Sequence, residues 1–324
     1  GRAAIHYNVP NTIDSIAEYA FSPTNLVSVT VPQNVKFVDS YAFGSMLYVL
    51  FESNQPTKIQ SNALYSPSFI LVNDTTPYKQ AWTQYSSKIK PIKDAIVSVD
   101  VTAKNSEADL YNEVTKRNPK NEYKLAEVLD LTISGSINSY DLMIMRNKMI
   151  NLRILDLSNA DIKANSYEYY TGFSTEDNML KEHSFRNLYS IKLPKTLIQI
   201  NNALQDCSSL QYAEFNNPHI GNNNLYSYAN CHLVLNEGVS SIAEGAFEST
   251  YIKSISLPST LTTISKNAFK NCSQLSAITF KDGLQSINDY AFYNTNLSTI
   301  SLPSTLQRIG SYAFQHAKVI NLYI

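Results

Sequence analysis

Histidine is the residue type that most often acts as a catalytic base or metal ligand, and this chain has five. No two stand at the H-x-H or H-x-x-x-H spacing by which one strand or helix brings two imidazoles onto a metal ion. They are His6, His183, His219, His232 and His316. We therefore expect no metal site and surface or loop positions for these residues. His232 directly precedes an apolar strand, so we expect it on the concave strand face, as a candidate ligand contact.

The cysteines do not suggest a nucleophile. Their number is odd and none forms a C-x-x-C pair, so neither a zinc site nor a disulfide framework is predicted. Cys207 and Cys272 each follow an alanine of the repeat described below by four residues, whereas Cys231 lies beside an irregular stretch and is not assigned. In other copies the same column holds Thr24, Met46, Thr250, Thr295 and Ala317. This pattern predicts a small side chain facing the interior.

No motif of a known catalytic class is present. The chain lacks G-x-G-x-x-G, G-x-S-x-G and the phosphate-binding loop. The adjacent acids Glu176 and Asp177 lie in a polar segment, 163–181, where a solvated loop is the simpler interpretation. A cation site there is the alternative, although no ligand spacing is recognisable. We expect no enzyme and no cofactor.

Composition excludes several partners. Charged residues make up 16% of the chain and the net charge is -1, which offers no basic surface for nucleic acid or an acidic membrane. No apolar run reaches the length of a membrane span. The 22 tyrosines against one tryptophan favour a protein on the outside of a cell.

One sequence motif recurs along much of the chain. Its clearest copy runs from Ile300 through Leu302, Pro303 and Ile309 to Ala313-Phe314. The alanine of this motif recurs at steps of 21 to 23 residues within each half of the chain, which is the spacing of leucine-rich repeats. These alanines are Ala20, Ala42, Ala63, Ala246, Ala268, Ala291 and Ala313. A shorter copy ends at Ala203-Leu204.

The chemistry of one copy predicts its structure. Alternating aliphatic residues form a half-buried strand, and the proline after them ends it. Two further aliphatics turn inward along a return segment. Alanine then leaves room for a turn, and phenylalanine stacks on its counterpart in the next coil. Each buried aliphatic contributes about 1.5–3 kcal/mol, but one coil cannot bury its own apolar edge, so the coils must stack. The fold class is therefore a solenoid of short parallel strands with irregular or 3-10 return segments and short capping helices.

The pattern I-x-L-P-x-x-L-x-x-I-x-x-x-A-F resembles that of the BspA-like leucine-rich-repeat proteins, which are common on the surface of Bacteroidetes and other gut and oral microbes. The resemblance covers residues 9–72 and 185–322. It implies a secreted or surface-anchored protein of a gut commensal that adheres to a host extracellular protein or glycoconjugate.

Two repeat segments are expected, 1–93 and 94–324. The first ends in a capping helix over about 77–85, with Thr76 as N-cap and Pro77 as the first helical residue. The second begins with a cap over 94–150, followed by repeats over 151–324. This cap should contain a helix over 106–117 with a capping box of Ser106 and Asp109, a strand over 129–133 that Gly135 ends, and a helix over 139–149. Irregular segments are expected at 163–181 and 216–224.

The residue before the repeat alanine forms a column of its own. It holds Tyr19, Tyr41, Asn62, Asn202, Gly245, Asn267, Tyr290 and Tyr312. The variation suggests a solvent-facing position, and adjacent coils should hold Tyr19 beside Tyr41 and Tyr290 beside Tyr312, about 5 Å apart. Tyrosine is suited to recognition surfaces. Together with His232, these tyrosines are our candidate interaction surface, and the alternative is that they only shield the edge of the coil.

The strand face should be flat. Its outward positions carry small residues, namely Ser28, Thr30, Ser254, Ser256, Ala277, Thr279, Thr299 and Ser301. This argues against a small-molecule enzyme site and allows a broad protein or glycan contact. Two alternatives to a recognition protein stay open: a structural spacer that displays another domain, and a glycan-processing accessory, which would need an acid pair or metal cluster.

Overall fold

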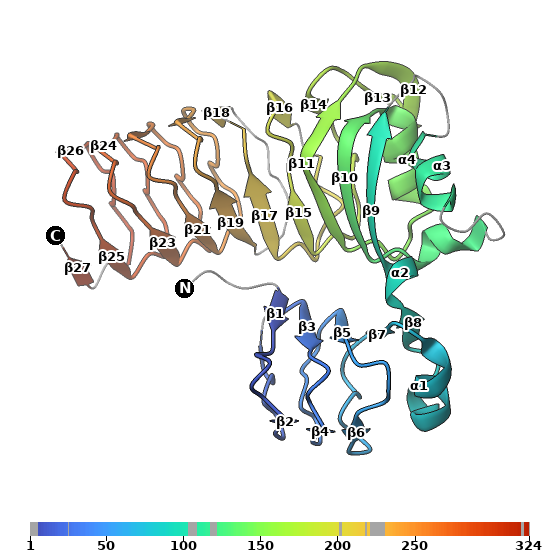
Figure 1. Ribbon diagram of the computed structural model, residues 1–324. Coiled ribbons are helices and arrows are strands. Elements are labelled where there is room, and N and C mark those ends of the chain that lie inside the picture. The colour runs from blue at the N-terminus through green and yellow to red at the C-terminus, as the bar shows by residue number, and fades with distance from the viewer. Residues whose placement is uncertain are drawn as a thin grey trace. The chain divides into compact units, whose positions relative to one another are not determined.

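A computed structural model of the chain describes residues 6–24, 26–102, 109–116, 122–200, 203–217, 219–220, 231–318 and 321–323. The chain divides into two compact units, Gly1–Val97 (unit 1) and Ser98–Ile324 (unit 2). We propose that these units are separate folding domains, each with its own array of coils (Figure 1).

Unit 1 is a stack of coils with a parallel sheet along one side. The sheet has the order β1 (His6–Asn8), β3 (Ser28–Val31), β5 (Tyr48–Phe51), β7 (Phe69–Val72) and β8 (Ile89–Pro91). The return segments form a second sheet of β2 (Ser15–Ile16), β4 (Phe37–Val38) and β6 (Lys58–Ile59). Val29, Val49 and Ile70 are in register on successive strands and are fully buried, so each coil completes the core of the one before it.

The helix that closes unit 1 is α1 (Thr75–Ala81). Its N-cap is Asp74 and not Thr76 as the sequence predicted, because the Asp74 carboxylate accepts the backbone N–H of Thr76 at 2.9 Å. Pro77 therefore takes the third helical position, where its missing N–H removes no bond because first-turn N–H groups have no partner within the helix.

Aromatic side chains join this cap to the coils. Trp82 lies between α1 and the short helix η1 (Thr83–Tyr85). Its ring meets Phe51 of β5 edge-on at 5.1 Å between ring centroids and meets Tyr78 of α1 at 4.8 Å. The cap thus covers the apolar end of the array.

Unit 2 contains a longer sheet of the same kind (Figure 1). Its order is β23 (Ala277–Thr279), β21 (Ser254–Ser256), β19 (His232–Leu235), β17 (Tyr212–Phe215), β15 (Ser190–Lys192), β11 (Ile154–Ile162), β10 (Asp130–Ile137) and β9 (Ile96–Thr102). Beyond it, β25 (Thr299–Ser301) pairs with β27 (Asn321–Tyr323). The return segments form a sheet of β18 (His219–Ile220), β20 (Ser241–Ile242), β22 (Thr263–Ile264), β24 (Ser286–Ile287) and β26 (Arg308–Ile309). The predicted solenoid is confirmed, and its return segments carry two-residue strands as well as turns.

Phenylalanines stack through the interior of unit 2 as the repeat predicts. Phe247, Phe269, Phe292 and Phe314 lie 5.2, 5.2 and 5.3 Å apart between successive ring centroids, with ring planes within 8° of parallel. The first three are fully buried. Phe21 and Phe43 repeat the arrangement in unit 1 at 5.7 Å. This column links each coil to the next.

The segment 163–181 is not irregular, which corrects the sequence prediction. It forms an antiparallel hairpin of β12 (Asn165–Tyr170) and β13 (Phe173–Thr175). It ends in β14 (Met179–Leu180), which pairs with β16 (Gln199–Ile200) as a return strand does. The hairpin is thus an insertion within one coil. Of the predicted Asn-rich irregular segment, 216–224, residues 218 and 221–224 lie outside the described residues.

A helical cap begins unit 2, where α3 (Asp109–Lys116) and α4 (Ser139–Asn147) lie beside the sheet (Figure 1). The short helix α2 (Ile92–Ala95), at the end of unit 1, precedes β9 in sequence, and η2 (Glu122–Glu127) precedes β10. The capping box predicted at residue 106 lies outside the described residues, and an observed one opens α4 with Asn138 and Asp141.

Gly135 does not end its strand. β10 continues to Ile137, and its pairing with β11 shifts by one residue between Thr132 and Ser134. Gly135 has φ +86, and a Cβ there would lie 2.1 Å from the carbonyl oxygen of Val101. The glycine therefore permits a close approach of the β9 backbone within the strand, while the bulge lies on the β11 side of the pairing, before Gly135.

Asp141 should make the stability of unit 2 depend on pH. Burial raises the pKa of its carboxyl from 3.8 to about 6, against the lowering effect of the N–H bonds it accepts from Asn138 and Leu110. Between these values the folded state holds a proton that the unfolded state has released, so the free energy of unfolding falls as pH rises. We expect the wild type to gain about 2 kcal/mol relative to Asp141→Asn between pH 7 and pH 4.5. Urea unfolding at both pH values tests this, and a difference independent of pH would contradict it.

None of the helices in the described part of the chain has the length and apolar character to cross a membrane.

Candidate functional site

The predicted tyrosine pairs are stacked. The ring centroids of Tyr19 and Tyr41 lie 5.5 Å apart with planes 4° from parallel, and those of Tyr290 and Tyr312 lie 5.0 Å apart at 25°. These distances confirm the predicted spacing. Tyr19 and Tyr312 are 53% and 54% exposed, so both pairs offer aromatic surface to solvent.

Most positions of this column share a left-handed backbone, with Asn62 as an exception. All four tyrosines have φ between 52 and 58, in the left-handed region. Gly245 has φ 66 in the same column. The variation that the sequence attributed to solvent exposure therefore reflects a conformation that glycine and asparagine adopt readily. A tyrosine there costs roughly 1–2 kcal/mol, and ring stacking offsets part of this cost, about 0.5–1.5 kcal/mol.

The pair in unit 2 belongs to a larger cluster, which we call the aromatic patch: Tyr290, Tyr293, Tyr312 and His316. Tyr293 meets Tyr290 edge-on at 5.7 Å and His316 at 5.2 Å. His316 is exposed and also has a left-handed backbone, with φ 61. Sequence reasoning missed Tyr293, although its position three residues after Tyr290 was a usable signal.

His232 lies on the strand face, apart from the tyrosines in the sheet arrangement. It begins β19, whereas Tyr290 and Tyr312 follow β24 and β26 of the return sheet. Its Nδ1 lies 2.6 Å from Ser254 Oγ, and burial lowers the pKa of its imidazole, which favours the neutral form at pH 7. The predicted residues therefore form separate surfaces, and His232 is already engaged by a neighbouring strand.

The middle of the same strand face carries charged groups that sequence reasoning missed. Asp156, Lys192 and Glu214 are in register on β11, β15 and β17. Lys192 Nζ lies 2.9 Å from Asp156 Oδ2, and the Tyr212 hydroxyl donates to Glu214 Oε2 at 2.7 Å. Burial would lower the pKa of Lys192, but its hydrogen bond to Asp156 and the surrounding carboxylates raise it. The small residues predicted for β21, β23 and β25 lie to one side of this charged centre, beyond β19.

A second polar cluster anchors the inserted hairpin. Arg146 of α4 is nearly buried and bonds to Asp206 Oδ2 at 2.7 Å and to the carbonyl oxygen of His183 at 2.7 Å. Its guanidinium lies 4.7 Å from the ring centroid of Tyr170 on β12, and that ring also contacts His183. His183 therefore lies in a turn, in line with the surface or loop position predicted for it, and is in addition part of an internal network.

His183 also marks a coil that the sequence pattern did not reveal. His183, Ser184 and Phe185 occupy the places that tyrosine, alanine and phenylalanine take elsewhere. His183 has φ 60, Ser184 is fully buried, and the Phe185 N–H donates to the carbonyl of Ala203 as in the other coils. Serine in place of alanine hid this copy.

The cysteines are interior residues, as predicted for Cys207 and Cys272. All three are buried, and burial raises the pKa of each thiol to about 11 or 12, which disfavours the thiolate. Among the residues that the structure describes, no group of three or more histidine, cysteine or acidic side chains is arranged to hold a metal ion.

Comparison with known proteins agrees with the repeat. A model of the BspA type leucine rich repeat region matches six copies, within residues 4–79, 171–250 and 219–323. No curated protein matches the chain significantly.

Two solved structures illustrate how distant structural relatives are. A leucine rich cell surface protein from Faecalibacterium prausnitzii has 17% identity and a TM-score of 0.31, over 98% of this chain and 87% of that chain. A leucine-rich repeat protein from Bacteroides ovatus has 16% identity and a TM-score of 0.31, over 96% and 84%. Superpositions this poor carry no argument about function. The family model covers well over half of the sequence, and the chain belongs to the BspA-type leucine-rich-repeat family.

Proposed function

We propose that the chain is a non-catalytic recognition protein that acts at the cell surface or after secretion and binds a host protein or glycoconjugate through the solvent-facing sides of its coils. Family membership supports protein binding or adhesion in general. The tyrosine-rich, weakly charged composition supports the extracellular site.

The observation that carries the proposal is the placement of Tyr19, Tyr41, Tyr290 and Tyr312. Each occupies a left-handed backbone position at which glycine or asparagine is less strained, and the rings form exposed stacks. Backbone strain of this kind is concentrated at functional sites. A stack that only shields the coil would serve as well with less strained residues, such as Asn267 of the same column.

Replacing the tyrosine pairs tests the proposal. We expect Tyr19→Asn/Tyr41→Asn, Tyr290→Asn/Tyr312→Asn, or both together to weaken binding to a matrix protein by roughly tenfold or more, because exposed tyrosines often dominate interface energies. Asparagine suits the left-handed backbone, so folding should change little. Binding of the full chain to immobilised collagen, fibronectin and laminin is the measurement.

The matched control is Tyr65→Asn, because Tyr65 is exposed in unit 1 but lies outside the tyrosine column. It should bind like the wild type. Binding that survives in the folded variants would reject the tyrosine surface. Absence of binding by the wild type to every probe would favour the structural spacer, the second candidate, which the continuous phenylalanine stack supports because it makes a stiff array.

A further inference from the structure

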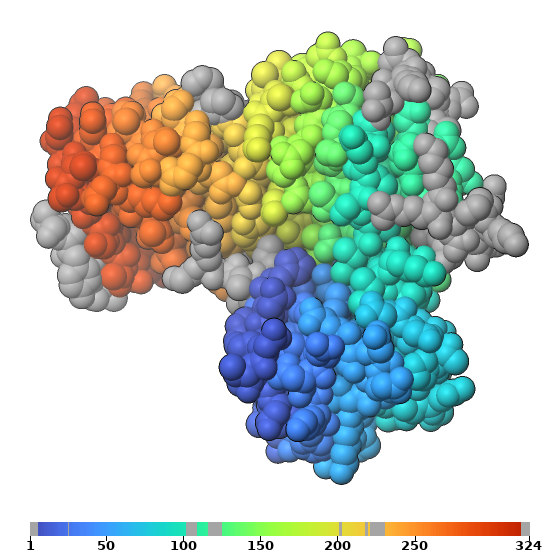
Figure 2. Space-filling model, in the orientation of Figure 1, coloured from blue at the N-terminus to red at the C-terminus, as the bar shows by residue number. Residues whose placement is uncertain are grey.

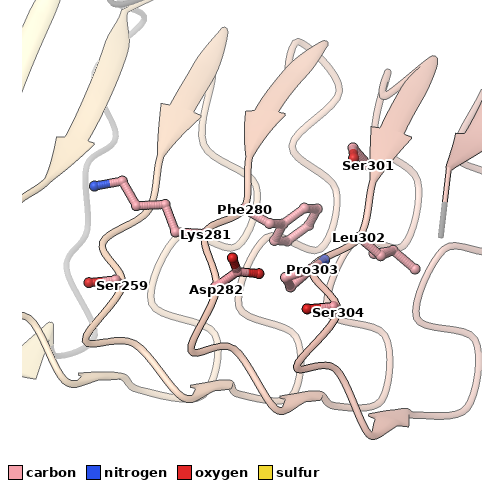
Figure 3. A pocket seen from close by; sticks show the side chains of 8 residues that line it. All are labelled: Ser259, Phe280, Lys281, Asp282, Ser301, Leu302, Pro303 and Ser304. Atoms are coloured by element: carbon pink, nitrogen blue, oxygen red, sulfur yellow. The ribbon is translucent and has the colours of Figure 1, made fainter.

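An open hollow of about 550 Å³ lies where the strand face of unit 2 meets the turns of three consecutive coils. Its residues come from the ends of β21, β23 and β25, in the part of the chain that is orange to red in Figure 2. Its lining, drawn in Figure 3, is Ser259, Phe280, Lys281, Asp282, Ser301, Leu302, Pro303 and Ser304.

The central coil departs from the repeat at this hollow. Phe280 and Asp282 stand where the neighbouring coils have a leucine and a serine. Phe280 packs edge-on against the buried Phe292, at 5.9 Å between ring centroids, while the ring remains half-buried and lines the hollow (Figure 3). An aromatic wall therefore replaces an aliphatic side chain in this coil.

Asp282 supplies an acceptor in the same wall. It is exposed, and among the described residues its carboxylate has no hydrogen-bond or ion-pair partner. Gly283, with φ +121, holds the turn that places it, since a Cβ there would lie 2.1 Å from the Ser259 carbonyl oxygen. The hydroxyls of Ser301 and Ser304 lie on the opposite side of the hollow and are also unengaged within the described part of the chain.

The positive charge at this place is already neutralised. Lys281 Nζ lies 2.6 Å from Glu237 Oε1, and the Ser259 hydroxyl donates to Glu237 Oε2 at 2.8 Å. The remaining unpaired charge in the hollow is the Asp282 carboxylate. The hollow therefore disfavours sulfated or carboxylated ligands and favours neutral ligands that donate hydrogen bonds.

We propose that this hollow binds one uncharged hexose unit of a polysaccharide. The C–H face of a pyranose packs on Phe280, and its hydroxyls donate to Asp282 and exchange hydrogen bonds with Ser301 and Ser304. Because the hollow is open, the glycan chain continues beyond it on either side. This inference rests on the proposed recognition function and names the ligand class for one surface.

The repeats supply the test variants. Phe280→Leu copies Leu257 and Leu302, and Asp282→Ser copies Ser259 and Ser304, so both fit the coil. We expect the full chain to bind at least one of laminarin, yeast mannan and maltoheptaose in calorimetric titration, with heparin binding more weakly. Each substitution should weaken binding by roughly tenfold. The control Glu244→Ser removes an exposed carboxylate outside the hollow and should bind normally.

The outcomes are separable from those of the tyrosine experiment. No binding of any neutral saccharide by the wild type overturns the inference, as does binding that both substitutions leave unchanged or a preference for heparin. Matrix-protein binding that depends on the tyrosines would still stand in each of these cases. Saccharide binding lost only in Phe280→Leu and Asp282→Ser would establish the hollow independently of the tyrosine pairs.

Discussion

Phe269→Ala is expected to destabilise unit 2 by about 3–5 kcal/mol, the usual cost of truncating a buried aromatic side chain. The ring is fully buried and lies 5.2 Å from both Phe247 and Phe292, in planes 8° and 1° from parallel. Truncation leaves a cavity between two coils and removes the stacking on both sides. A solenoid has no distant contacts to compensate, because each coil is stabilised by its neighbours alone.

Two spectroscopic signals can locate this loss. The single tryptophan, Trp82, lies in unit 1, whereas far-ultraviolet circular dichroism reports both units. We expect Phe269→Ala to shift the dichroism transition in urea and to leave the Trp82 fluorescence transition in place. Tyr293 is a half-buried aromatic residue of the same unit, and Tyr293→Ala should shift the dichroism transition much less. A common shift of both signals would contradict our proposal of two separate folding domains.

Arg146→Ala is expected to destabilise unit 2 by roughly 3 kcal/mol and to release the inserted hairpin, because the carbonyl oxygens of His183 and Phe185 lose their charged donor. Burial would raise the pKa of Asp206, but hydrogen bonds from His183 and Arg146 hold it below its usual range. The guanidinium also bonds to backbone carbonyls and stacks near Tyr170. In the described part of the chain, Arg146 and His183 are the basic side chains within ion-pair distance of Asp206.

Hydrogen exchange distinguishes this local role from general destabilisation. Amides of β12 and β13 should lose protection in Arg146→Ala more than those of β21 and β23. Arg146→Lys should recover part of the hydrogen-exchange protection of the hairpin, since lysine keeps the positive charge but lacks the planar guanidinium group. Arg308→Ala, at an exposed arginine, is the control. Equal protection of the hairpin in wild type and Arg146→Ala would show that the cluster does not hold it.

Much of the architecture could be predicted because every copy of the repeat has the same pattern of buried and exposed positions. The alternation around Ile255 and Ile300 requires a strand, and the spacing of Ala246, Ala268 and Ala291 requires coils of one length. The phenylalanine stack and the buried cysteine column follow from the same register. The spacing of the tyrosine pairs was predictable for this reason too.

Features that depend on local backbone geometry were harder to predict from the sequence. The column of Tyr19 and Gly245 was interpreted through solvent exposure, whereas its left-handed φ is a property of the turn. Gly135 was expected to end a strand, yet the strand continues through it, and its missing side chain leaves room for the carbonyl of Val101. Neither conformation is encoded by hydrophobic periodicity, which reports burial and not dihedral angles.

The repeat length, the inward columns and the family could be predicted from the amino-acid order alone, since these depend on contacts between residues about 22 positions apart that recur throughout. Which departures from the repeat meet in space is visible only in the folded chain. Arg146 and Asp206 are 60 positions apart, and Phe280 and Asp282 line one hollow with Ser301 and Ser304. Such meetings occur once in the chain, so no periodic signal records them. Whether two such residues meet depends on the length of the coils between them, including any insertion.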